Sequence, residues 1–120
     1  MKKGEKQAEV YKLNVLDRMN LLRVLPKQGD IATLRINREL RESLALTEKE
    51  AKAIDYRAMP DGATMVDVKK AQALVKGFQL GPIALGIIKD TLKAMNDAKP
   101  PTLGLEHINL YETFVEKKAA

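Results

Sequence analysis

The chain has no cysteine and no tryptophan, and it holds a single histidine, His107, and a single serine, Ser43. Without cysteine there is no disulfide, no thiolate metal site and no cysteine nucleophile. With one histidine, a zinc site would need several carboxylates. A serine–histidine triad would have to use Ser43, which lies in a helical pattern without a nucleophile elbow. We therefore expect a protein that is not an enzyme and has no catalytic residue, metal or cofactor.

Aromatic residues and long apolar runs are also scarce. Two phenylalanines and three tyrosines offer few platforms for stacking the bases of a single-stranded nucleic acid. The longest apolar run, Leu80–Ile88, is about half as long as a membrane span. The basic start of the chain lacks the apolar stretch of a signal peptide. These absences predict no membrane association and a cytoplasmic location.

The chain does have enough apolar residues for a core and a modest excess of positive charge. Hydrophobic residues make up 45% of its 120 positions, which suits one globular domain. Lysine and arginine total 21 against 16 acids, a net charge of +5. This excess permits contact with nucleic acid or an acidic protein surface, and a solvated lysine-rich surface explains it equally well. The acidic pairs on shared helix faces are Glu39 with Glu42 and Glu112 with Glu116. We expect each of these glutamates to form a solvated ion pair with a nearby lysine or arginine. The alternative is a carboxylate-based active site.

The N-terminal half predicts a tail and then helices. Residues 1–12 are polar and predict a flexible tail, followed by a single globular domain over 13–118. A first helix is expected over Leu13–Leu25, with Asn14 as a possible N-cap and Pro26 ending it.

The segment Ile31–Leu46 alternates like a strand at its start, and from Ile36 onward it has the apolar spacing of a helix. Thr47 and Glu50 then form a capping-box pattern, which predicts a short helix over Glu48–Ala53.

The clearest strand signal lies in Ile54–Val68, where two alternating runs flank Pro60-Asp61-Gly62. Asp-Gly suits the positive φ angles of a hairpin turn. Gly77–Leu80 is a candidate third strand. A helix is expected from Pro82 to about Asp97, because proline is well placed at a first helical position, and a last helix from Gly104 to Lys117.

Together these elements predict an α+β fold. It would be a mainly helical single domain, with about four helices packed on a small antiparallel β-hairpin or three-stranded sheet. Gly86 lies inside a predicted helix, where glycine costs about 1 kcal/mol relative to alanine. A close packing contact is the expected reason for it.

A basic helix face is one candidate binding surface. The stretch Ala32–Asn37, followed by a helix, resembles a ribbon-helix-helix module, in which a strand enters the major groove. Arg35, Arg38 and Arg41 would then contact DNA. The alternative interpretation is a charged, solvated helix face.

Surplus apolar residues are the second candidate surface. The predicted helices carry more leucines than one core evidently uses, notably Leu21, Leu22, Leu105 and Leu110. These could form a contact with a partner protein or a homodimer, and the alternative is a well-filled core.

Two segments resemble a known group of proteins. The run Leu22–Asp30, which contains Leu25-Pro26-Lys27-Gln28-Gly29, and then Thr33-Leu34-Arg35-Ile36, resembles small uncharacterised proteins of bacteriophages and prophages. Leu105–Phe114 resembles the closing helix of the same family, with its acidic-His-x-x-Leu-Tyr-Glu-x-Phe pattern. The middle of the chain matches only in layout and departs at Pro60-Asp61-Gly62 and Gly81-Pro82.

The resemblance implies a phage-type accessory protein in the cytoplasm of a bacterial host. It brings no catalytic residues, since the family has no assigned activity. The resulting expectation is non-catalytic binding to a host or viral protein partner. The alternative is a small DNA-binding regulator that uses Arg35, Arg38 and Arg41.

Overall fold

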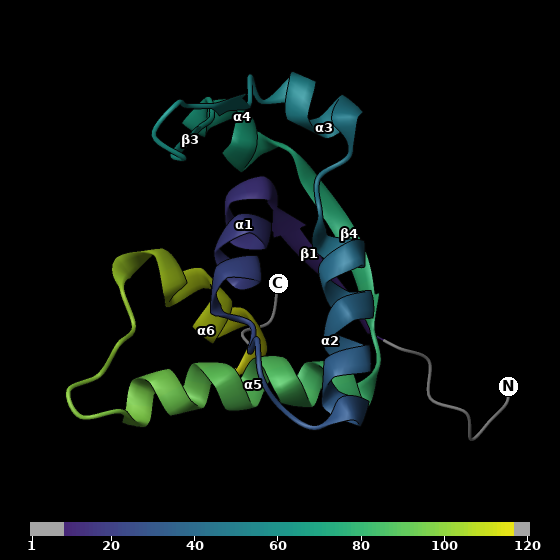
Figure 1. Ribbon diagram of the computed structural model, residues 1–120, viewed down its shortest axis with the longest axis vertical. Helices are drawn as coiled ribbons and strands as arrows, with labels where there is room; N and C mark the ends of the chain where they lie inside the picture. The colour runs from purple at the N-terminus through teal and green to yellow at the C-terminus, as the bar shows by residue number, and fades with distance from the viewer. Residues whose placement is uncertain (1–8, 117–120) are drawn as a thin grey trace, which may run out of the picture.

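In the computed structural model, which describes residues 9–116, the chain begins with a strand, β1 (Glu9–Asn14) (Figure 1). β1 pairs antiparallel with β4 (Val75–Leu80), in a register that runs from Glu9 opposite Leu80 to Asn14 opposite Val75. The prediction of a tail over residues 1–12 is therefore wrong for residues 9–12. Residues 1–8, 117 and 118 lie outside the described part.

Polar and apolar residues are mixed in β1, and in the structure they lie on two different faces of the strand. Tyr11 and Leu13 face inward, opposite Phe78 and Lys76, and the ring of Tyr11 stacks on that of Phe114 with centroids 5.0 Å apart. Lys12 lies on the outer face and is exposed. The segment resembles a polar tail only until its distant partner strand is known.

The predicted hairpin shrinks to a two-residue ladder. β2 (Arg57–Ala58) pairs with β3 (Thr64–Met65), and all four residues are exposed. The turn between them has Gly62 at φ 88°, as its Asp-Gly sequence predicted. The rest of the predicted strands is not extended into the ladder, because Ile54 and Asp55 form the turn that follows α3 (Glu48–Ala53), and Asp67 caps α4 (Val68–Ala73), which takes Val68.

Local capping sets the other helix starts. Asn14 accepts a hydrogen bond from the backbone N–H of Asp17 and starts α1 (Val15–Val24). Asp30 does the same for Thr33 and starts α2 (Ile31–Leu44). The expected strand at Ala32–Asn37 is thus helical from its first turn.

The C-terminal part contains α5 (Pro82–Asp97), a 3₁₀ turn η1 (Leu105–His107) and α6 (Ile108–Phe114). The described chain therefore has six α-helices and two two-stranded antiparallel sheets. The predicted α+β, mainly helical class is confirmed, while the main sheet is β1–β4 and not the expected hairpin.

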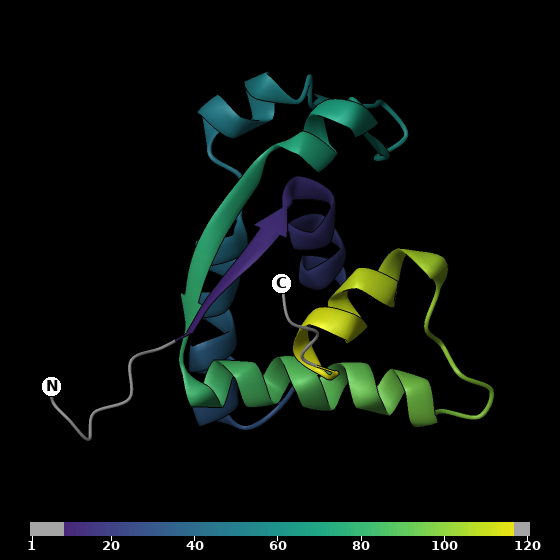
Figure 2. The ribbon, with the colours of Figure 1, turned by 180° about the vertical axis from the view of Figure 1, so that it is seen from behind.

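Two apolar clusters divide the molecule. The larger lies between the β1–β4 sheet and helices α1, α2, α5 and α6, and the smaller joins Val15, Ile54 and Ala71 beneath α3 and α4. Figure 2 shows α3, the hairpin and α4 at one end of the molecule and α5 at the other. α1 contributes to both clusters, through Val15 and Leu21. Within residues 9–116, no helix has the length and apolar character needed to cross a membrane.

If β1 is a packed strand, substituting Tyr11 will destabilise the fold. Tyr11→Ala removes the ring that stacks on Phe114, and we expect it to lower the free energy of unfolding by about 2 kcal/mol. Lys12→Ala, on the exposed face of the same strand, should change it by less than about 0.5 kcal/mol. Urea unfolding of both variants distinguishes a strand from a tail, since a tail would make the two changes equally small.

Gly86 lacks the close contact that its sequence position suggested. A Cβ atom built there has no neighbour within 4 Å outside the local helix backbone. Gly86→Ala should therefore raise the free energy of unfolding by about 0.5–1 kcal/mol. Thermal unfolding measures this, and a loss of stability would show that the site is sterically closed.

Candidate functional site

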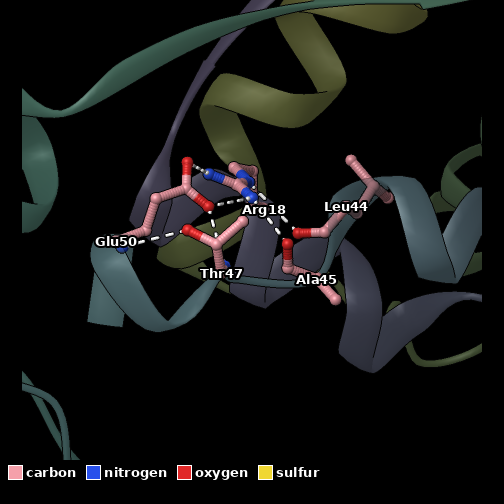
Figure 3. Close-up of polar contacts among 5 residues, drawn as sticks. All are labelled: Arg18, Leu44, Ala45, Thr47 and Glu50. Carbon is pink, nitrogen blue, oxygen red and sulfur yellow. Dashed lines mark hydrogen bonds and ion pairs between the residues drawn. The ribbon is translucent and has the colours of Figure 1, made fainter. Parts of the chain in front are cut away.

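The guanidinium of Arg18 on α1 is fully buried and makes four hydrogen bonds (Figure 3). Its Nε donates to the carbonyl of Leu44 at 3.1 Å, and its Nη2 donates to the carbonyl of Ala45 at 2.8 Å. Nη1 and Nη2 also donate to the two carboxylate oxygens of Glu50, at 2.8 and 3.0 Å. This bidentate geometry satisfies a charge that would otherwise be costly to bury.

Glu50 takes part in two structures at once. As the third residue of α3, it completes the capping box, in which its Oε1 accepts from the backbone N–H of Thr47 at 2.9 Å. The hydrogen bond from Arg18, followed by the one from Thr47, lowers the pKa of Glu50 from 4.5 to about 2 against the opposing effect of burial. The carboxylate is therefore ionised at neutral pH and holds α3 against α1.

The far side of the guanidinium lies on an aromatic ring. The Cζ of Arg18 is 5.1 Å from the ring centroid of Phe78 on β4, and the Nζ of Lys76 is 5.6 Å from the same centroid. Arg18 thus joins α1, the end of α2, α3 and the sheet. Four donor contacts occupy its side chain, so its role is to hold these segments together.

Next to this cluster the surface forms an apolar groove of about 500 Å³. We call it the α1–hairpin groove. One wall is Met19, Leu22 and Arg23 of α1, the second is formed by residues 45–48 and Ala51, and Tyr56 and Thr64 close it from the hairpin. Arg18, one residue from Met19, fixes the junction of α2 and α3 that forms the second wall.

The predicted interface leucines separate in the structure. Leu21 and Leu110 are fully buried in the main core, so their prediction as interface residues is wrong, because helix packing uses them internally. Leu22 is half-buried and lines the groove. Leu105 is 86% exposed on η1 and remains a candidate contact.

The predicted basic face is helical and interleaved with acids. Arg35 and Arg38 are exposed, while Arg41 is half-buried and donates from Nη2 to the carbonyl of Leu25 at 3.1 Å. The ribbon-helix-helix interpretation is wrong, because Asp30 starts α2 before the expected strand. Glu39 and Glu42 share the exposed face of α2 with these arginines.

His107 is packed and holds a turn. Its Nδ1 accepts from the backbone N–H of Gly104 at 2.8 Å, and its Nε2 is 3.9 Å from a carboxylate oxygen of Glu106. Ser43 lies exposed on α2, a different element. Among residues 9–116, no three or more histidine, aspartate or glutamate side chains are grouped to hold a metal ion.

Sequence reasoning missed Arg18, Glu50 as its partner, and Tyr56. The buried residues of α1 are Val15, Arg18 and Leu21. Because one of these core positions has a charged residue, the apolar spacing of the sequence does not indicate which face of the helix is buried. The only signal for Glu50 was its capping-box position.

Comparisons of the chain with protein-family models, curated proteins and solved structures find no match.

The low pKa of Glu50 predicts an acid-sensitive contribution to stability. Because the folded-state pKa is depressed, this contribution is fully present above pH 4.5 and is lost as the pH falls towards 2. Glu50→Gln should lower the free energy of unfolding by roughly 2–3 kcal/mol at pH 6, less than for a fully buried pair because Glu50 is partly solvated.

Urea unfolding at pH 6 and near pH 2 measures the effect. The difference between the native chain and Glu50→Gln should shrink at the lower pH, since Glu50 is then about half protonated in the folded state and fully protonated in the unfolded state. Glu48→Gln, on the exposed side of the same helix, should stay within about 0.5 kcal/mol of the native chain at pH 6. A difference for Glu50→Gln that is the same at both values would contradict this assignment.

Proposed function

We propose that the protein acts by non-catalytic binding to a protein partner through the α1–hairpin groove. One observation carries this proposal: an apolar groove of about 500 Å³, open at the surface and walled by Met19, Leu22 and Tyr56. Methionine and tyrosine are typical of adaptable protein-binding surfaces. The arginine cluster beneath it holds the walls in place, which lowers the entropy lost on binding.

The occupant that fits this groove is a protein segment with apolar anchors and an acidic residue. Arg23 lies on the groove wall, and among residues 9–116 its one side-chain hydrogen bond runs from Nη1 to the side chain of Asn20 on the same helix, at 3.2 Å. Its charge is therefore available to a carboxylate of the partner.

The cellular location proposed for this binding rests on the resemblance to phage proteins and on the absence of cysteine. We place it in the bacterial cytoplasm, with a host or viral protein as the partner.

DNA binding by the α2 arginines has weaker support. Residues 9–116 hold 16 basic and 15 acidic residues, so all but +1 of the net charge of +5 belongs to residues 1–8 and 117–120. With Arg41 bonded to the carbonyl of Leu25, two free arginines remain on an acid-containing face. Salt-dependent retention on DNA, lost in an Arg35→Ala/Arg38→Ala double variant, would favour this alternative.

Site-specific photo-crosslinking tests the proposed groove. A photoreactive phenylalanine placed at Tyr56, which is 42% exposed in the groove wall, should capture a discrete partner in bacterial cells. The same group at Met65 is the matched control, because Met65 lies on the hairpin beside Thr64 and outside the groove lining.

The captured partner must then bind the purified protein. Tyr56→Lys should weaken that binding at least tenfold by placing a charge among apolar walls, and Met65→Lys should change it by less than twofold. Equal crosslinking at both positions, or equal affinity of both variants, would reject the groove as the binding site.

A further inference from the structure

The strand β4 has an open edge. Within the described residues β4 pairs with β1 alone, so its other edge has backbone N–H and C=O groups without a partner strand. Four of the six residues of β4 are exposed: Val75, Lys76, Gly77 and Gln79. β4 contains no proline that would prevent a new strand from pairing. Figure 2 shows β1 and β4 side by side at the outside of the molecule, with α2 behind them.

A hollow of about 320 Å³ lies between the end of β4, α2 and the start of α5. Gln79 and Leu80 border it from β4, and Ile36 and Leu40 from α2. Ile83 borders it from α5 and is 65% exposed. An extended segment paired with β4 would direct alternate side chains to one face, and this apolar hollow lies beside the end of the strand.

One charged group lies in the lining of this hollow. Glu39 is exposed, and no ion pair joins it to Arg35 within residues 9–116. Its carboxylate is available to a basic side chain of an arriving segment.

From these three features we propose that β4 binds an extended segment of a partner protein as an added antiparallel or parallel strand. The segment carries an apolar side chain for the hollow and a lysine or arginine for Glu39. Backbone hydrogen bonds to the edge supply affinity, and the hollow supplies specificity. This site is separate from the α1–hairpin groove and does not depend on the function proposed for it.

The hollow sets the chemistry of the arriving segment, which needs one apolar side chain and one basic side chain. A second copy of this chain is the competing occupant, because β4 itself has an exposed apolar residue, Val75, next to an exposed lysine, Lys76. The sedimentation experiment below distinguishes the two occupants.

A displayed library of random 12-residue peptides tests the proposal on the full chain. The selected peptides should contain alternating apolar residues and a basic residue, and binding should slow hydrogen exchange of the backbone amides in residues 75–80. Ile83→Asp should weaken binding at least tenfold. Ile31→Asp is the control, since Ile31 is also exposed, at 62%, and also lies in the first turn of a helix.

The role of Glu39 is tested in the same way. Glu39→Lys should weaken binding of the basic peptides at least fivefold, whereas Glu42→Lys, three residues along α2 and outside the hollow lining, should change it less than twofold.

Three results would overturn the proposal: no enriched peptide, no protection of residues 75–80, or equal binding by the two isoleucine variants. Peptides lost with Tyr56→Lys but retained with Ile83→Asp would support the groove and reject the strand site. A dimer in sedimentation experiments that Ile83→Asp dissociates would show that a second copy occupies the edge.

Discussion

The burial of the Arg18 charge is the constraint on which the rest of the structure depends. A guanidinium removed from water is tolerated only where its donors are satisfied. Its acceptors here come from the end of α2 and from α3, and Phe78 of the sheet lies against its face. Because Arg18 also lies between the two apolar clusters along α1, these contacts fix how the two parts of the molecule meet.

α2 connects the Arg18 contacts with both candidate binding surfaces. Its C-terminal carbonyl group at Leu44 holds Arg18, and the residues that follow form a wall of the α1–hairpin groove. Further back, Asn37 donates from Nδ2 to the carbonyl of Pro26 at 2.5 Å, which ties the preceding loop to the helix. Ile36 and Leu40 border the hollow beside β4. One rigid helix therefore supports two surfaces of different chemistry.

The sequence predicts local features well and long-range pairing poorly. The caps at Asn14 and Thr47, the turn at Gly62 and the helix start at Pro82 all follow from short-range chemistry. β1 was missed because only its pairing with a distant strand distinguishes it from a tail. The arginine cluster was missed for a similar reason, since no local pattern indicates which charged residue enters a core, and the groove it supports was missed with it.

The pairing of β1 with β4 also bears on how the chain folds during synthesis. Paired residues are separated by 61 to 71 positions, so the first strand leaves the ribosome long before its partner exists. Until then Tyr11 and Leu13 lack their partner strand, and Arg18 lacks the ring of Phe78. The nascent protein must complete roughly its first 80 residues before its sheet can close, which favours late, cooperative folding over a stepwise route from the N-terminus.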